Sequence, residues 1–174
     1  MLRNSTKLFT IIAGLTLSGQ AFAQASDAET TTASVRLATA IDITEDTALN
    51  FGSVVKGSSG TTTVTIDATS GARGSSGGNA TLITGATPTR ASYSVTGEPN
   101  ATFAIAITDD TIDLTNGGTG SLALTLTRSS TSGTLSGGGT ATFGVGGSLA
   151  IDNTDATDVA GTYTGTFEVT TTYN

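Results

Sequence analysis

Apolar residues recur at every second position along most of this chain. A period of two places successive side chains on opposite faces, which is typical of an antiparallel strand with one buried and one solvated face. The intervening positions are mostly threonine, a β-branched residue that suits a pleated surface. The clearest runs are Val64, Ile66 and Ala68; Ala91, Tyr93 and Val95; Ala101, Phe103, Ile105 and Ile107; Leu122, Leu124 and Leu126; Ala141, Phe143 and Val145; and Leu149 and Ile151.

Glycine-rich groups separate these runs. Residues 56–60, 71–79, 116–120 and 137–139 supply the turn-forming residues that connect short strands. No stretch after residue 23 has a helical period. We therefore expect an all-β fold of roughly eight to ten strands, an antiparallel immunoglobulin-like or jelly-roll β-sandwich that occupies residues 45–174 as one domain.

The first 23 residues have the three parts of a cleavable signal peptide. Arg3 and Lys7 precede an apolar run over residues 8–17, and Ala21-Phe22-Ala23 offers a cleavage site. The apolar run is too short to span a membrane. We expect export, with cleavage after Ala23.

Three residue types are missing, and their absence restricts the chemistry. The chain has no cysteine, histidine or tryptophan. It therefore has no disulfide, no Ser-His-Asp or Cys-His pair and no usual ligand for zinc, haem or iron–sulfur clusters. After removal of the signal peptide, five basic residues face 14 acidic ones, which disfavours nucleic-acid binding. We expect no cofactor and no enzyme activity.

Two acidic clusters are the best candidates for a metal site. Carboxylates this close together on loops suit Ca²⁺, although their spacing does not match the EF-hand pattern. The alternative is a solvated turn in which each side chain bonds its own backbone. The candidates are Asp109, Asp110 and Asp113 in one cluster and Asp152, Asp155 and Asp158 in the other.

The N-terminal part of the mature chain suggests a route to assembly. Residues 24–44 begin with a polar leader, for which we expect flexibility, and then alternate, with Val35, Leu37, Ile41 and Ile43 on one face. Such a strand can add to the sheet edge of a neighbouring copy while its side chains fill that neighbour's pockets. The alternative is that residues 32–44 form the first strand of their own sheet.

Four blocks of sequence carry a family resemblance. Residues 49–55, 90–101, 143–149 and 161–174 resemble the secreted bacterial proteins of domain of unknown function 4402. That family is similar to fimbrial and spore-coat-like β-sandwich subunits, which implies a pilin-like protein at a Gram-negative cell surface. The last strand is also similar to that of chaperone–usher subunits, which implies contact of Tyr163, Phe167, Val169 and Tyr173 with a periplasmic chaperone and delivery to an outer-membrane usher.

Together these features predict a structural subunit of a surface filament. Its partners would be other copies of itself, joined by N-terminal donor-strand complementation. The alternative is a monomeric secreted β-sandwich that binds carbohydrate or calcium through its acidic loops.

Overall fold

The structure is a computed structural model that describes residues 26–85 and 87–174. The predicted signal peptide lies outside the described residues. The chain divides into two compact units, Met1–Arg36 and Leu37–Asn174. The described part of the first unit, residues 26–36, contains no helix or strand. All strands among the described residues belong to the second unit.

The second unit is all-β, and its described residues contain no helix. Every strand pairing is antiparallel. The strands are β1 (Asp42–Thr47), β2 (Val54–Val55), β3 (Thr61–Ile66), β4 (Arg73–Ser76), β5 (Thr81–Leu82), β6 (Ala91–Thr96), β7 (Thr102–Ile107), β8 (Thr111–Thr115), β9 (Ser121–Arg128), β10 (Ser132–Thr134), β11 (Thr140–Asp152) and β12 (Val169–Tyr173).

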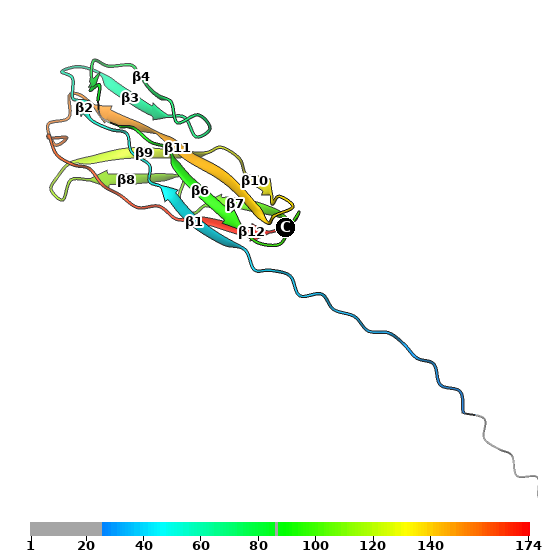
Figure 1. Ribbon diagram of the computed structural model, residues 1–174. Coiled ribbons are helices and arrows are strands. Elements are labelled where there is room, and N and C mark those ends of the chain that lie inside the picture. The colour runs from blue at the N-terminus through cyan, green and yellow to red at the C-terminus, as the bar shows by residue number, and fades with distance from the viewer. Residues whose placement is uncertain (1–25, 86) are drawn as a thin grey trace, which may run out of the picture. The chain divides into compact units, whose positions relative to one another are not determined.

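The strands form three hydrogen-bonded sheets (Figure 1). The largest has seven strands, with the order β1-β6-β11-β3-β4; β9 also pairs with β11, and β8 pairs with β9. The second contains β10-β7-β12, and the third pairs β2 with β5. The described strands thus confirm the expected antiparallel all-β class, and one part of the structure curls into a half-barrel.

β11 organises the large sheet because it pairs with three strands. Its first part, from Thr140 to Val145, pairs with β6, and its last part, from Gly147 to Asp152, pairs with β3. The middle, from Val145 to Leu149, pairs with β9. Gly144, Gly146 and Gly147 are buried at this junction. A Cβ on Gly146 would overlap the backbone of Ile66 and Ala68, so the close approach of the strands requires glycine there.

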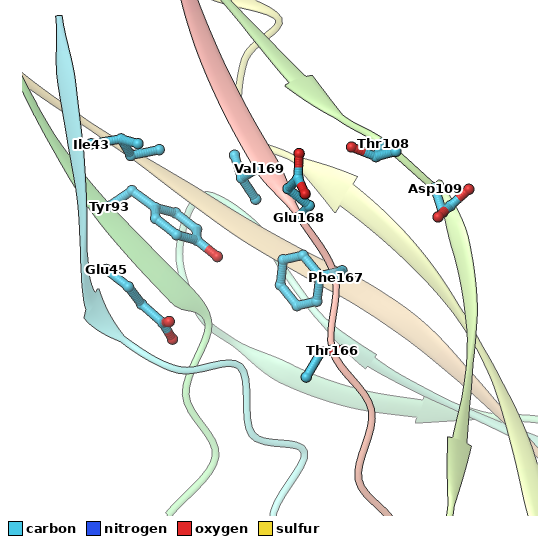
Figure 2. A pocket seen from close by; sticks show the side chains of 9 residues that line it. All are labelled: Ile43, Glu45, Tyr93, Thr108, Asp109, Thr166, Phe167, Glu168 and Val169. Carbon is cyan, nitrogen blue, oxygen red and sulfur yellow. The ribbon is translucent and has the colours of Figure 1, made fainter.

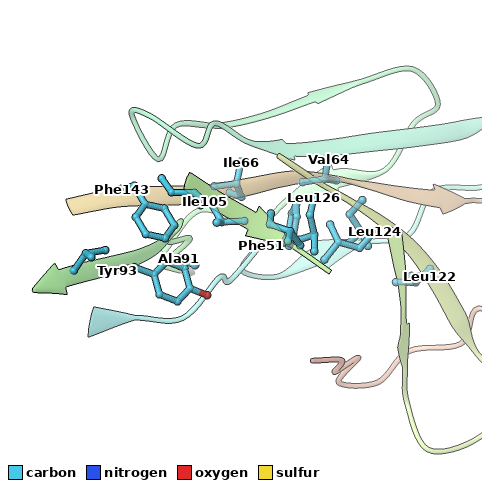
Figure 3. Packing of buried hydrophobic residues seen from close by; sticks show 14 of the residues in the cluster. Phe51, Val64, Ile66, Ala91, Tyr93, Ile105, Leu122, Leu124, Leu126 and Phe143 are labelled. Atoms are coloured by element: carbon cyan, nitrogen blue, oxygen red, sulfur yellow. The ribbon is translucent and has the colours of Figure 1, made fainter. Parts of the chain in front are cut away.

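The alternating apolar residues of both main sheets share one hydrophobic core (Figure 3). Ile66 and Val145 from the large sheet and Phe103 from β7 are almost completely buried. Full burial of one such side chain stabilises a fold by about 1.5–3 kcal/mol. The core therefore replaces the cross-links that a cysteine-free chain lacks.

The observed strands differ from the expected ones in several places. Residues 26–41 contain no strand, because only β1 finds a partner, in β6. The predicted turn over residues 71–79 contains β4, which pairs with β3. The runs ending at Val145 and Ile151 form a single strand, β11. β12 begins only at Val169, because the residues before it pair through one bridge, Thr164 with Thr115.

The junction in β11 predicts a strong effect of a single methyl group. We expect Gly146→Ala to lower the free energy of unfolding by about 1–3 kcal/mol, because the new Cβ overlaps backbone atoms that cannot move independently. Urea unfolding with an unchanged slope measures this loss. Gly137→Ala is the matched control, since a Cβ there meets nothing within 4 Å. Equal stability of the two variants would contradict this account of β11.

Candidate functional site

The candidate site is the seam between β1 and β12, the edge strands of two different sheets. Among the described strands, β1 pairs only with β6 and β12 pairs only with β7. The two strands contact each other without forming a ladder. Each therefore presents an edge of unpaired backbone groups to the seam.

Two contacts fix the relative direction of β1 and β12. At one end of the seam, Tyr173 donates a hydrogen bond from its hydroxyl to the carbonyl oxygen of Thr39, at 2.8 Å. At the other end, Ile43 and Glu45 lie across from residues 166–169. The strands therefore run antiparallel to each other, held together at the Thr39 end and separated by a groove at the other.

This groove has a volume of about 530 Å³ (Figure 2). Its apolar lining comes from strands on both sides of the seam, and carboxylates and hydroxyls stand among the apolar groups. The lining residues are Ile43 and Glu45 on β1, Tyr93 on β6, Thr108 and Asp109 after β7, and Thr166, Phe167, Glu168 and Val169 at the start of β12.

Tyr93 forms part of the groove wall. Its ring stacks on Phe143 with the ring centroids 5.1 Å apart and the planes inclined by 18°. Burial, together with the negative charge of Glu45, raises the pKa of Tyr93 to about 12. The hydroxyl therefore stays protonated at physiological pH, and it offers a hydrogen-bond donor in the groove rather than a catalytic base.

The comparisons with known proteins give one match. Residues 41–173 match the family model described as Domain of unknown function (DUF4402). This chain belongs to the DUF4402 family. No curated protein and no solved structure matches it. The DUF4402 domain thus includes both strands of the seam and begins six residues after Val35.

The four predicted donor residues separate into two pairs. Ile41 and Ile43 pack against the core of their own DUF4402 domain, and Ile43 pairs with Val95 in β6. Val35 and Leu37 are 87% and 90% exposed. The interpretation as a first strand of the same sheet therefore holds from Asp42 onward, whereas Val35 and Leu37 have no place in a described strand.

The four predicted C-terminal contact residues lie along one segment but not on one strand. Val169 and Tyr173 belong to β12, and Phe167 precedes it and lines the groove. Tyr163 lies outside β12, where its hydroxyl donates to the carbonyl oxygen of Val159 at 2.9 Å. All four are partly buried and pack against the core, so their exposed parts are limited.

A second groove, of about 820 Å³, adjoins the first through Phe167, which lines both. Its walls are mainly aliphatic and come from the segment before β2, from β8 and β9 and from the end of β11. Among them are Leu49, Phe51, Ile112, Leu114, Leu122, Leu124, Leu149 and Ile151. The segment before β12 borders this groove as well.

The first acidic cluster is not gathered into a site. Asp109 lines the groove, Asp110 lies 3.9 Å from the guanidinium of Arg128, and Asp113 belongs to β8 opposite Ala123. The sequence missed β8 because its carboxylates suggested a loop. No group of three carboxylates that could hold a metal ion occurs within residues 26–85 and 87–174.

Two carboxylates of the second acidic cluster accept hydrogen bonds from residues of their own turns. Asp152 accepts hydrogen bonds from the backbone and hydroxyl of Thr154, and Asp155 accepts the same pair from Thr157. These bonds lower the pKa of both carboxyls. Lys56 donates to the carbonyl oxygens of Asp155 and Asp158, so its ammonium already supplies a positive charge to this loop.

Sequence reasoning gave Asn153 only a place in the second acidic loop, and it did not single out Glu45. Asn153 is buried between the second cluster and the β2–β3 turn, where it accepts from the backbone of Gly57 and donates to Gly60 and Thr62. Glu45 lies on β1 and lines the groove. The one sequence signal for this position is that Glu45 follows Ile43 by two residues and therefore lies on the same face of the strand.

No helix in the described part of the DUF4402 chain is long and apolar enough to cross a membrane.

The raised pKa of Tyr93 predicts a loss of stability at high pH. An unfolded tyrosine loses its proton near pH 10, whereas folded Tyr93 keeps it to about pH 12. The unfolded state therefore binds fewer protons in this window, and the free energy of unfolding falls by up to about 1.4 kcal/mol per pH unit. We expect Tyr93→Phe to flatten this slope in urea unfolding between pH 10 and 12, and an unchanged slope would contradict the assignment.

Proposed function

We propose that this protein is a structural subunit of a surface filament, in which the N-terminal strand of one copy completes the sheet edge of the next. In this proposal the fold is a pilin-like, immunoglobulin-like β-sandwich that lacks one strand. The subunit is exported by its signal peptide, is handled in the periplasm by a chaperone and an outer-membrane usher, and has no enzyme activity.

Two features together support this proposal most: a seam between two strands that each have one unpaired edge, and an alternating segment that belongs to no described strand. β1 and β12 each lack a second partner among the described strands, and the groove between them is lined by both apolar and acidic side chains. Val35 and Leu37 are exposed at alternate positions of a segment without a strand. A strand added in the seam would satisfy both edges and bury these two side chains.

Residues 33–38, which we call the donor segment, and the groove also complement each other in charge. Arg36 is the one charged residue in residues 30–38. The groove is lined by Glu45, Asp109 and Glu168, all of which are exposed. Opposite charges of this kind guide a partner and set its register, even where each surface pair adds little energy.

The length of the donor segment suits the seam. Residues 33–38 span roughly 20 Å when extended, at about 3.3 Å per residue. β12 contains five residues and β1 contains six, so each has a comparable length. A single strand of this length fills the seam without a longer loop.

The acidic groove lining also explains why open edges need not cause aggregation. An inward-facing charge on an edge strand makes random pairing costly, because an apolar strand would bury that charge without a partner. Glu45 has this position on β1. The groove therefore favours a strand that brings its own positive charge, as residues 33–38 do.

Removal of the donor segment tests the proposal. We expect a chain without residues 24–38 to be exported but to form no filaments in electron micrographs of producing cells, because the seam of each copy stays empty. The deletion of residues 24–30 keeps Val35 and Leu37 and should leave filaments in place. Filaments of normal length from the longer deletion would refute the proposal.

A point variant tests whether the side chains of the donor segment enter the groove or whether the segment need only be long enough. Leu37→Asp would bury a carboxylate in the acidic groove, so we expect filament yield to fall by about tenfold or more. Ser34→Asp, at the opposite parity, is the matched control and should have a much smaller effect.

A further inference from the structure

The residue just before the domain, Thr39, is held by both of its backbone polar groups. Its N–H donates to the carboxylate of Glu98 at 2.9 Å, and its carbonyl oxygen accepts from the hydroxyl of Tyr173 at 2.8 Å. The same hydroxyl accepts from the backbone N–H of Glu98 at 2.6 Å. We call Thr39, Glu98 and Tyr173 the Thr39 clamp.

The clamp joins three distant parts of the chain at the closed end of the seam. Thr39 precedes β1, Glu98 lies in the turn between β6 and β7, and Tyr173 ends β12. The tyrosine hydroxyl also lies so close to Gly97 that a Cβ there would overlap it, so this turn is shaped around the ring. The clamp is therefore built from packing as well as from hydrogen bonds.

The position of the clamp matters because a free N-terminal strand has two possible acceptors. It can enter the seam of another copy, or it can fold back into the seam of its own domain. Folding back requires a tight hairpin between residue 38 and the start of β1 at Asp42. The turn of that hairpin would contain Thr39, whose N–H and carbonyl are already engaged.

The sequence at this point opposes the same hairpin. Three-residue hairpin loops end on a residue with a positive φ angle, a position that favours glycine. Residues 39–41 are Thr-Ala-Ile, so the β-branched Ile41 would have to take this position. The local sequence and the clamp therefore both disfavour the hairpin that folding back would require.

We infer that the Thr39 clamp prevents each subunit from filling its own seam and so reserves residues 33–38 for a second copy. Tyr173 and Glu98 are then positioning residues for assembly. This inference rests on the proposed donor-strand function and adds to it the device that chooses between intermolecular and intramolecular insertion.

Cysteine cross-linking tests the inference cleanly, because the natural chain has no cysteine. The mature full-length chain with Val35→Cys and Val169→Cys is oxidised, and the products are separated without reductant. With the clamp intact we expect a ladder of intermolecular disulfides. Mass spectrometry after thiol alkylation distinguishes an internally cross-linked monomer from an unreacted one.

Two variants open the clamp in different ways. Tyr173→Phe keeps the ring but removes the hydroxyl, and Thr39→Pro removes the N–H that donates to Glu98, together with the threonine side chain, and fixes φ at residue 39. In each we expect the ratio of internal to intermolecular disulfide to rise by about fivefold, as the loss of one hydrogen bond to Thr39 implies. Thr39→Ala keeps both backbone groups and should leave the ratio unchanged.

The outcomes separate the two claims. A ladder with the same ratio in all variants would overturn the inference about the clamp and leave the donor-strand function supported. Absence of intermolecular disulfides from the clamp-intact chain would contradict the donor-strand function itself, and the clamp inference with it. A raised ratio in Tyr173→Phe and Thr39→Pro, but not in Thr39→Ala, would support the inference.

Discussion

The hydrogen bonding of β11 is the constraint on which the rest of the structure depends. This strand has partners along both edges. It pairs with β6 along its first part, with β9 across its middle and with β3 along its last part. Three buried glycines allow the backbones to come this close. Because β11 gathers these strands into one sheet, β7 and its partners β10 and β12 form a separate sheet. The two sheets share a core but no ladder, and the seam between β1 and β12 is the result.

Under the proposed function, the seam gives a specific role to a chain without cysteine, histidine or tryptophan. Its specific features are backbone edges, a groove with both apolar and acidic lining, and a segment that alternates outside any sheet. None of these requires a catalytic group. Backbone pairing supplies affinity in such an interface, and the alternate side chains supply specificity. The proposed donor segment matches this mixed lining, because the apolar Val35 and Leu37 flank the basic Arg36.

The sequence predicted the strands wherever alternation coincided with a buried face. Tyr93, Phe103 and Leu124 lie in the core at the parity that their spacing indicated. The sequence could not show that β11 is continuous, because glycine contributes no hydrophobic signal at positions 144, 146 and 147. It also could not separate Ile43 from Val35, because both have the same parity and only the pairing of β1 with β6 distinguishes them. The Thr39 clamp was equally hidden, since it depends on a backbone group and two side chains far apart in sequence.

Backbone amide exchange tests the central claim, the insertion of a strand beside β12, most directly. In β12 the neighbouring hydrogen bonds of Glu168 and Asn174 show that even-numbered residues face β7, so the amides of Val169 and Thr171 face the seam. NMR exchange rates are measured for the full chain with and without an excess of a peptide of residues 31–38. The account predicts slower exchange at Val169 and Thr171 while Thr170 and Thr172, already paired with β7, change little. Unchanged exchange at Val169 and Thr171 with saturating peptide would contradict it.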